Sequence, residues 1–191
     1  MTKRIHILGA SGSGTTTLAL KISSIYNYTH FDTDDFFWVK TDPPFTKHTN
    51  IEERVRDLSA ALNSVDQWVL SGSLCGWGDR FIPFFDLVIF LWIPEEVRMK
   101  RLEMRERQRY GEKILSGGEM YQSHLEFMEW ASQYDAGDMN IRSKQLHYTW
   151  LKQLPCKVLK IEGDLDIEEK LKRVKEVLLY EDISDIGTSI S

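Results

Sequence analysis

The most informative segment of the chain is residues 9–16, which read Gly-Ala-Ser-Gly-Ser-Gly-Thr-Thr. This segment fits the pattern G-x-x-x-x-G-K-[ST] at every position except the lysine, where Thr15 stands. An apolar run over residues 5–8 precedes it, and a helical apolar pattern over residues 15–26 follows it. The glycines let backbone N–H groups turn inward, and the following helix adds its unpaired amides. The segment therefore predicts a loop that binds phosphate groups, a P-loop.

The loop supplies a set of candidate nucleotide ligands. Thr16 is expected to place its hydroxyl on a Mg²⁺ ion that bridges the phosphates. A glycine-rich turn that binds no ligand is the alternative, but the preceding strand, the following helix, the spacing and the terminal hydroxyl all favour a nucleotide site. The predicted nucleotide-binding residues are Gly9, Ser11, Gly12, Ser13, Gly14, Thr15, Thr16 and Thr17.

Thr15 departs from the pattern in charge. A P-loop lysine is a positive charge that follows the β- and γ-phosphates through phosphoryl transfer. Threonine keeps a hydroxyl donor but loses the charge, and such a loss costs several kcal/mol of transition-state stabilisation. Lys21 lies farther along the same helix and is expected to point away from the loop. Either another cation replaces the lysine or transfer is slow.

Strand-like runs and helical patterns alternate along the whole chain. This alternation predicts an α/β fold with a five-stranded parallel sheet and helices on both faces, in three layers. Since ligands bind beyond the carboxyl ends of parallel strands, the P-loop and the polar loops after the other strands are expected to meet in one crevice. The strand-like runs are residues 5–8, 30–31, 68–70, 87–93 and 157–161.

Length and composition exclude several classes of protein. A chain of 191 residues is expected to form one domain. Its formal net charge of −5 argues against a general binder of nucleic acids or anionic membranes. Cys75 and Cys156 have no metal-ligand spacing and fit a reducing compartment, and the longest apolar stretch, residues 87–93, is too short to cross a bilayer. We therefore expect a cytoplasmic protein; its oligomeric state is not predictable.

A cluster of aspartates, Asp32-Thr33-Asp34-Asp35, directly follows the second strand-like run. One carboxylate at this position is suited to holding Mg²⁺ through water, and another to accepting a proton from a substrate hydroxyl. An aspartate-rich turn that caps a helix is the alternative. Three aromatic residues come next, of which we expect Trp38 to lie at a pocket and the others in the core.

Arginines at spacings of three and four form a stripe on one predicted helix, and they are Arg98, Arg101, Arg105 and Arg109. Residues 98–109 hold six basic and two acidic groups. An ordinary solvated helix with i,i+4 ion pairs is the alternative. Beside a P-loop, the stripe is better interpreted as a clamp on phosphates, because guanidinium groups bind phosphate oxygens bidentately. The clamp would supply the charge that Thr15 lacks.

The combination of a P-loop with Asp-x-Asp after the second strand resembles shikimate kinase and its nucleoside monophosphate kinase relatives, including adenylate kinase. The third strand and its loop, residues 68–73, carry no terminal aspartate, which favours the shikimate kinase side. The resemblance extends over residues 5–179. Residues 32–38 and 76–80 in particular resemble a bacterial subgroup described as adenylate-kinase-like or as P-loop ATPases.

The resemblance implies roles for individual residues. It implies that Thr16 and Asp32 bind the metal and that Asp34 is a catalytic group for the acceptor. It also implies that the loop over residues 72–80 faces the acceptor and that Arg80 binds an anionic group of it. In such kinases lid arginines reach the transferring phosphoryl group, here Arg101, Arg105 and Arg109, with Arg142 closing the clamp. The predicted substrate-binding residues are Asp34, Trp38, Gly72, Trp77 and Arg80.

The resemblance also implies an organisation, that of a P-loop NTPase fold with a helical lid insertion. Residues 1–180 would form a single kinase-like domain, with a substrate-binding helical segment at about 36–65 and a lid at about 101–142. A helix over about 119–134 is expected to pack within the lid. Residues 181–191 are predicted to be a flexible tail. Residues 161–164 resemble a loop that wraps adenine, although a tight turn would look the same.

Three functional hypotheses follow. The first is a kinase that uses ATP and Mg²⁺ to phosphorylate a small molecule, either a nucleoside monophosphate or a shikimate-like hydroxyl compound. The second, prompted by Thr15, is a nucleotide-binding module or switch with weak or no phosphoryl transfer. The third is a structural or interaction protein on an inactive P-loop scaffold, which predicts no nucleotide affinity. The chain's partners would be a nucleotide and, for the kinase, a small-molecule acceptor.

Overall fold

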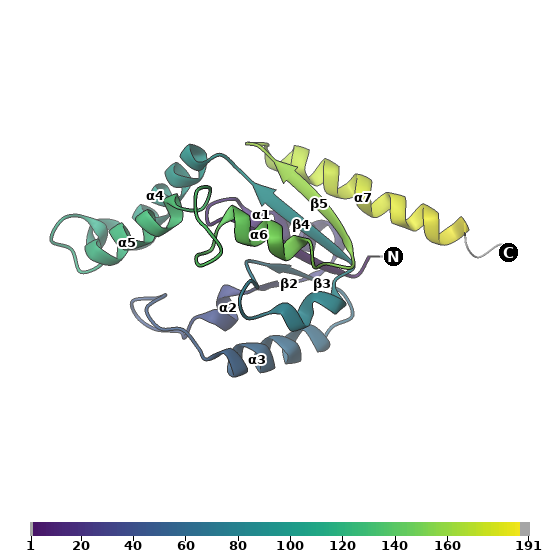
Figure 1. Cartoon of the computed structure of the whole chain (residues 1–191), viewed down its shortest axis with the longest axis horizontal. Coiled ribbons are helices and arrows are strands. Elements are labelled where there is room, and N and C mark those ends of the chain that lie inside the picture. Colours follow the sequence, from purple (N-terminus) through teal and green to yellow (C-terminus); the bar gives the residue numbers. More distant parts are fainter. Residues whose placement is uncertain (1, 188–191) are drawn as a thin grey trace.

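Strands and helices alternate along the chain in the computed structural model, which describes the backbone of residues 2–187 and the side chains up to residue 179 (Figure 1). The strands are β1 (Arg4–Gly9), β2 (Thr29–Asp32), β3 (Trp68–Ser71), β4 (Leu87–Trp92) and β5 (Lys157–Glu162). The α-helices are α1 (Thr15–Tyr26), α2 (Asp34–Phe37), α3 (Ile51–Asn63), α4 (Glu95–Tyr110), α5 (Tyr121–Ser132), α6 (Lys144–Leu151) and α7 (Ile167–Gly187). Two 3₁₀ helices are η1 (Asp79–Phe84) and η2 (Gly111–Ile114).

The five strands form one parallel sheet in the order β2-β3-β1-β4-β5, which confirms the predicted α/β fold class. In the centre, Ile5 of β1 is paired with Val69 of β3 on one side and Leu87 of β4 on the other. From β1 the chain passes to the edge strand β2, returns to β3 beside β1, and then crosses to β4 and β5 on the other side of β1. The P-loop after β1 therefore lies where the winding direction changes, which is where open α/β sheets bind ligands.

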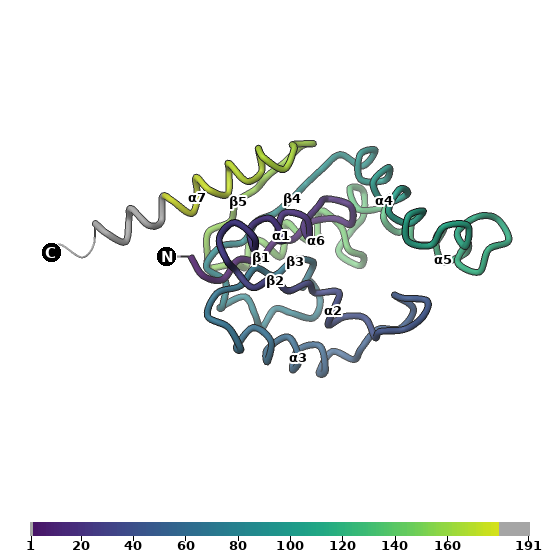
Figure 2. Tube along the Cα trace, turned by 180° about the vertical axis from the view of Figure 1, so that it is seen from behind, coloured from purple at the N-terminus to yellow at the C-terminus, as the bar shows by residue number. Residues whose placement is uncertain are grey.

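Side chains alternate between the two faces of the sheet, so each face has its own core. One face, with Ile5, Ile7 and Ile89, is covered by α1 and α7 through Leu18, Ile22 and Val174 (Figure 2). The other face is covered by α3, η1 and α6 (Figure 1). Its buried members include Leu8, Leu58, Leu70, Phe81, Phe85, Phe90 and Trp150.

The structure corrects some details of the sequence-based prediction. Ile25 belongs to the helical apolar pattern of residues 15–26, but it is 56% exposed and does not lie on the inner face of α1. The short helix α2, both 3₁₀ helices and α6 were not predicted, although the Ser143 hydroxyl caps α6 by accepting a hydrogen bond from Leu146 N at 3.0 Å. Helix α5 lies within the range predicted for a lid helix. The predicted tail overlaps the end of α7, and residues 188–191 lie outside the described residues.

Two segments extend away from the sheet on the side opposite the end of α7. One contains the second half of α4 with η2 and α5, and the other is the loop between α2 and α3 (Figures 1 and 2). These segments lie within the ranges predicted for the lid and for the substrate-binding segment. They flank the cavities described below.

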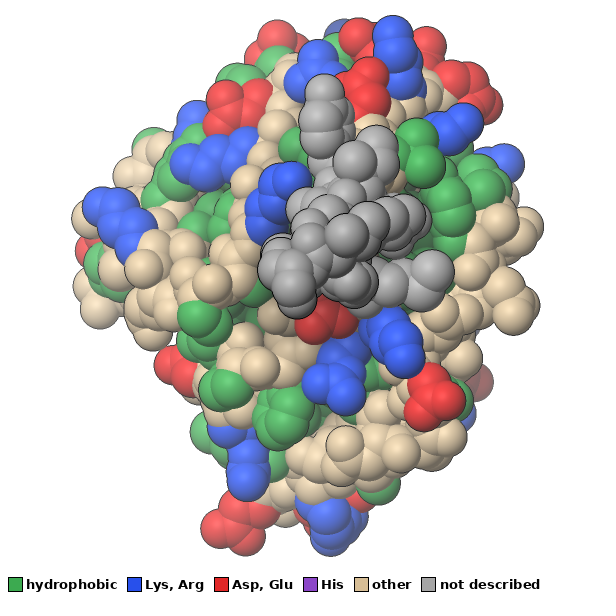
Figure 3. Space-filling model, turned by 90° about the vertical axis from the view of Figure 1, so that its right-hand side faces the viewer, with side chains coloured by type: hydrophobic (Ala, Val, Ile, Leu, Met, Phe, Trp, Pro, Cys, Tyr) green, Lys and Arg blue, Asp and Glu red, His purple; other side chains and the backbone are tan. Residues whose placement is uncertain are grey.

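Two further observations concern the charge on one face of the molecule and the apolar length of its helices. Figure 3 shows the side of the molecule where α7 ends, and there the visible basic side chains are interspersed with acidic ones rather than gathered in one patch. Across residues 2–187, none of the helices is long and apolar enough to span a membrane.

Candidate active site

The P-loop has the backbone conformation that its glycines predict. Gly12 and Gly14 have φ values of 80° and 91°, and Gly14 precedes the first residue of α1. A Cβ at Gly12 would lie 2.9 Å from the Arg98 carbonyl oxygen and 3.1 Å from Leu102, so helix α4 packs directly against the loop. Only glycine combines that φ with this close approach.

A cavity of about 790 Å³ opens over the P-loop; we call it the nucleotide cavity. It brings together most of the site residues predicted from five separate segments of the chain. Ser13 is absent from its lining because its side chain is fully buried and its backbone N–H donates to Ala10 O within the loop. The predicted residues that line it are Gly9, Ser11, Gly12, Gly14, Thr15, Thr16, Thr17, Asp32, Asp34, Gly72, Arg101, Arg105, Arg109 and Arg142.

Thr16 and Asp32 are in contact at the cavity wall. The Thr16 hydroxyl donates to Asp32 Oδ2 at 2.8 Å, and Ser71 donates to the same oxygen at 2.7 Å. His30 Nε2 lies 2.9 Å from the Ser71 hydroxyl, so the end of β2 is tied to the end of β3. Asp32 is thereby fixed beside the P-loop threonine.

This donor set fits a magnesium ion that is carried in on phosphates. The described residues contain no cluster of three or more His, Cys, Asp or Glu side chains able to hold a metal alone. Mg²⁺ is usually held by one or two carboxylates together with substrate phosphates and water. One hydroxyl and one carboxylate, Thr16 and Asp32, match that requirement.

Asp34 has a perturbed acidity. Its pKa is raised, first by the loss of solvent within the cavity and second by the negative charge of Asp32, while the positive charges of Arg142 and Arg105 oppose the shift. Its backbone N–H donates to Asp32 Oδ1 at 3.0 Å, which fixes the Asp32 carboxylate relative to the backbone of Asp34. A carboxylate with a raised pKa at a cavity wall is suited to general base catalysis.

The arginines of α4 divide into two groups. Arg105 and Arg109 line the nucleotide cavity with Glu106 Oε1 between them, at 3.7 Å and 3.9 Å. Burial, followed by the charge of Arg109, lowers the pKa of Arg105. Arg101 also lines the cavity but is held by an ion pair with Asp164 at 2.8 Å.

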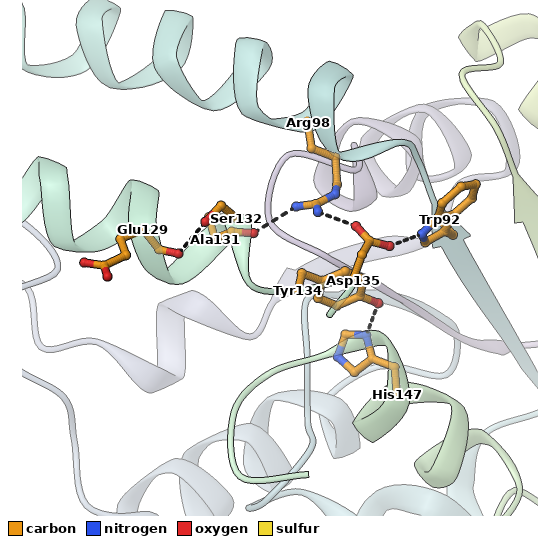
Figure 4. Close-up of polar contacts among 8 residues, drawn as sticks. All are labelled: Trp92, Arg98, Glu129, Ala131, Ser132, Tyr134, Asp135 and His147. Atoms are coloured by element: carbon orange, nitrogen blue, oxygen red, sulfur yellow. Dashed lines mark hydrogen bonds and ion pairs between the residues drawn. The ribbon is translucent and has the colours of Figure 1, made fainter. Parts of the chain in front are cut away.

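Arg98 does not belong to the clamp, contrary to its place in the predicted stripe. Its side chain is fully buried and donates to Asp135 Oδ2 at 2.7 Å and to the Ala131 carbonyl at 3.3 Å (Figure 4). Trp92 Nε1 donates to the other oxygen of Asp135 at 2.6 Å. Arg98 therefore joins the start of α4 to the end of α5, the two helices that belong to the segment predicted as a lid.

A second buried network orients the segment that carries Arg142. His147 of α6 lies 2.8 Å from the Tyr134 hydroxyl (Figure 4). It also lies 3.1 Å from the Ser73 hydroxyl. Burial, followed by the charge of Arg142, lowers the pKa of His147 to about 3, so its ring is neutral at physiological pH. Arg142 itself has no ion pair among residues 2–187, and its guanidinium lies 5.4 Å from the Trp130 ring centroid.

A second cavity, of about 720 Å³, adjoins the first on the side away from α1; we call it the aromatic cavity. Asp34, Arg105, Arg109 and Arg142 line both cavities, so these residues lie where the two meet. Trp38 lines the aromatic cavity, as predicted for a pocket residue.

Two of the predicted substrate residues lie elsewhere. Trp77 packs against the core, and its Nε1 donates to Ser73 O at 3.2 Å because the chain turns back between residues 74 and 78. Arg80 is exposed on η1, beyond this turn. Neither lines the nucleotide cavity or the aromatic cavity.

Sequence reasoning missed Lys170, a cation of the nucleotide cavity. Lys170 of α7 lines this cavity and is only 6% exposed. Burial, followed by the charge of Arg101, lowers its pKa, while Asp164 and Asp166 oppose the shift. A signal was present, because Lys170 lies three residues after Ile167 and so shares the inner face of the terminal helix.

The fold and the site define a protein of the P-loop class, with a parallel sheet, a phosphate-binding loop and a kinase-like arrangement of acidic and basic groups. Comparison with known proteins gives the family. A family model described as "AAA domain" matches residues 5–128, which is more than half of the chain, and the chain belongs to this family. It is also 48% identical over 178 residues to the Bacillus subtilis (strain 168) protein YqaC, described as uncharacterized, covering 93% of this chain and 98% of that one.

Solved kinase structures have the same fold. The shikimate kinase of Bacteroides thetaiotaomicron superposes with a TM-score of 0.56 at 19% identity, covering 93% of this chain and 99% of that one. The shikimate kinase of Acinetobacter baumannii, in complex with shikimate, gives 0.54 at 16% identity and 95% coverage of both chains. A sugar kinase of a Janibacter species gives 0.51 at 15% identity and 96% coverage of both. The likeness confirms the predicted P-loop kinase fold.

Proposed function

We propose that this chain is a small-molecule kinase that transfers the γ-phosphoryl group of ATP, with Mg²⁺, to an acceptor hydroxyl. The observation that carries the proposal is the junction of the two cavities. There Asp34 and three arginines lie between a P-loop with its Thr16–Asp32 pair and a second cavity able to hold an acceptor. A protein that only binds nucleotides has no need for the second cavity or for a carboxylate with a raised pKa at the junction.

In the proposed mechanism, the P-loop amides and the N-terminus of α1 bind the phosphates of ATP. Thr16 and Asp32 would hold a magnesium ion, which would supply positive charge to the phosphates. The oxygen of the acceptor hydroxyl attacks the γ-phosphorus, and Asp34 accepts the proton of that hydroxyl. Arg105, Arg109 and Arg142 neutralise the charge of the transferring group, and catalysis consists mainly of positioning and charge stabilisation.

The same proposal assigns the movable parts of the chain. The segment over residues 101–142 acts as the lid, and residues 36–65 form the acceptor side, within a domain that extends to residue 180. Closure of the lid over both cavities would exclude water and limit the hydrolysis of ATP. Residues 161–164, which resemble an adenine-binding loop, do not line the nucleotide cavity, whereas Leu165 and Asp166 directly after them do and would contact the nucleobase. We propose a cytoplasmic location for this activity.

A nucleotide-binding switch is the second candidate, and the observation that favours it is Thr15. The threonine lines the nucleotide cavity at the lysine position of the P-loop pattern. If the arginines of α4 do not reach the γ-phosphate, the protein would bind ATP and transfer its phosphoryl group only slowly.

Calorimetric titration of ATP with and without Mg²⁺ tests the proposed site. Thr16→Ala removes the hydroxyl that fits the metal and should weaken Mg²⁺–ATP binding by about tenfold or more, because a hydrogen bond to a charged group contributes about 1.5–3 kcal/mol. Ser24→Ala is the control, since Ser24 is exposed on the same helix and lies outside the cavity. Equal affinity of the Thr16 variant and the unmodified protein, in the presence of Mg²⁺, would contradict the assignment.

A further inference from the structure

The aromatic cavity has two ring-bearing walls. The first wall is built by α2 and the loop after it. The ring centroids of Phe37 and Trp38 are 4.9 Å apart, those of Trp38 and Phe45 are 5.8 Å apart, and His48 lies 5.9 Å from Phe37. Backbone hydrogen bonds from Val39 to Lys47 O and from Thr49 to Phe37 O hold this loop as a closed hairpin. The wall is therefore a connected group of rings on a hydrogen-bonded loop.

The second wall comes from the lid segment. Phe127 and Trp130 of α5 have ring centroids 6.0 Å apart and lie at an interplanar angle of 32°. Tyr110, at the end of α4, and the buried Met120 extend this wall. Arginines support both walls, since Arg109 lies 4.6 Å from the Phe45 ring centroid and Arg105 lies 5.6 Å from that of Phe127.

Four of the charged residues of this cavity lie where it meets the nucleotide cavity, and they are Asp34, Arg105, Arg109 and Arg142. Glu106 and Glu126 line the aromatic cavity alone, and the Glu106 carboxylate lies 3.7 Å from Arg105 and 3.9 Å from Arg109. The rest of the walls carries eight aromatic or imidazole rings, those of Phe37, Trp38, Phe45, Tyr110, Phe127, Trp130, His48 and His124. A molecule bound here would have its reacting group among the charges and its body between the rings.

This distribution favours one class of acceptor over others. A sugar or a polyhydroxy acid carries hydroxyl groups on most of its carbon atoms and needs hydrogen-bond partners for them. The aromatic side chains of the two walls provide few such partners. At the junction of the two cavities a cationic alcohol would meet the guanidinium of Arg142, which has no ion pair with the side chains described up to residue 179. A planar heteroaromatic ring gains from stacking between aromatic walls, and its ring nitrogens and exocyclic groups can bond to the imidazoles and Ser123.

We propose that the acceptor is a heteroaromatic alcohol of up to nucleoside size, neutral or anionic, whose ring lies between the two walls and whose hydroxyl lies at Asp34. In the reaction, the hydroxyl oxygen forms a bond to the γ-phosphorus while the bond from that phosphorus to the β–γ bridging oxygen breaks. The hydroxyl proton passes to the Asp34 carboxylate. The products are ADP and the phosphate monoester of the alcohol. The proposal rests on the proposed kinase activity and names its substrate class.

Two measurements on the full-length protein test this inference. ADP formation is measured with Mg²⁺–ATP and a panel in which thymidine, adenosine and pyridoxine represent heteroaromatic alcohols, and shikimate and gluconate represent polyhydroxy acids. Tryptophan fluorescence is followed in parallel, because Trp38 and Trp130 lie in the cavity walls. We expect at least one heteroaromatic alcohol to raise ADP formation tenfold or more and to change the fluorescence, and the two acids to do neither.

A pair of variants on α5 locates the binding site. Phe127→Ala should raise the KM for the active alcohol about tenfold or more while leaving the affinity for Mg²⁺–ATP within twofold. Leu125→Ala is the matched control, since Leu125 is 43% exposed on the same helix and lies outside the cavity lining. An unchanged KM in the Phe127 variant would overturn the placement of the ring between these walls.

The outcomes separate this inference from the proposed function. Stimulation by shikimate or gluconate, with no response to the heteroaromatic alcohols, would overturn the substrate class and leave the kinase proposal standing. Absence of ATP binding in calorimetry would instead contradict the kinase proposal itself. Binding of ATP, together with fluorescence changes from an alcohol but no ADP, would support the acceptor site and contradict phosphoryl transfer.

Discussion

Thr15 is the single residue on which the choice between a kinase and a switch depends. It stands at the lysine position of the P-loop pattern, and four arginines line the same cavity. Lys170 adds a further buried cation from α7. The chain therefore carries positive charge around the phosphate site although none comes from the loop.

Restoring the lysine tests whether that charge is sufficient. If the arginines already neutralise the γ-phosphate, Thr15→Lys should change turnover by less than about tenfold. The reason is that the arginines already stabilise the charge on the transferring group, so a further positive charge adds little. The measurement is ADP formation at saturating Mg²⁺–ATP, with Thr15→Gln as a control for side-chain length without charge. A gain of about a hundredfold with lysine alone would favour the switch.

The positive charge of Arg142 lowers the pKa of Asp34, so the effect of its removal on the pH dependence of turnover is predictable in sign. A general base must be ionised, and turnover should therefore rise with pH through the pKa of Asp34. The charge of Arg142 lowers that pKa, against the effects of burial and of Asp32, which raise it. Arg142→Gln removes the lowering charge, so the acid limb of kcat/KM should move to higher pH.

The matched control for that shift is Arg107→Gln. Arg107 is exposed on α4 and lines neither cavity, so the same loss of charge should leave the acid limb where it is. An acid limb that stays in place in the Arg142 variant would mean that a group other than Asp34 titrates.

At the level of elements, the ends of β2 and β3 are joined by a close contact that permits only glycine. Gly72 has a φ of 106°, and a Cβ there would overlap the hydroxyl of Thr33, which is buried. Gly72→Ala should therefore lower the free energy of unfolding by about 2 kcal/mol or more, through backbone strain and the displacement of Thr33. Urea denaturation measures this loss.

The control for that substitution is Gly117→Ala, which shares the positive φ but has open space around its Cβ position. Strain alone should cost this variant less than the Gly72 variant loses. Equal losses would mean that the contact with Thr33 contributes nothing.

The sequence was sufficient to predict the elements whose residues follow a strong local rule. The strands β1, β3 and β4 are almost entirely buried, whereas the edge strands β2 and β5 are only partly buried. Helix α3 begins at Ile51, after the N-cap Asn50, whose side chain accepts from Glu53 N at 2.9 Å. Short elements without such a rule, such as α2 and η1, were not predictable. Arg98 followed the spacing of its neighbours but is buried, because only the packing of α4 against residues 131–135 determines its surroundings.

The site was predictable wherever a residue directly follows a strand. The P-loop, Asp32 and Asp34 all lie at the carboxyl ends of strands, so the parallel sheet brings them together. Trp77 and Arg80 also follow a strand, but a turn at residues 74–78 directs the chain away from the cavity. The spacing of Lys170 from Ile167 indicates the inner face of α7, but only the packing of α7 brings that face to the nucleotide cavity.

At the scale of the whole molecule, the lid segment and the loop after α2 enclose a space that both substrates would share. Arg109 of α4 contacts Phe45 of that loop, with its guanidinium 4.6 Å from the ring centroid. The pair links the two segments across the aromatic cavity, and closure on a nucleotide would bring the arginines of α4 toward its phosphates. The arginines should then act more on the transition state than on ATP binding.

The double variant Arg105→Gln/Arg109→Gln tests this division between turnover and binding. Because the charge that develops on the transferring group is stabilised only during the reaction, the loss of both arginines should lower kcat by about a hundredfold or more. The affinity for Mg²⁺–ATP should fall by less than about tenfold. Calorimetry and ADP formation measure the two quantities, and Arg107→Gln is again the control on the same helix, since its guanidinium lies outside both cavities. A kcat that survives the double substitution would remove Arg105 and Arg109 from the mechanism and leave Arg101, Arg142 and Lys170 as the candidates to replace the P-loop lysine.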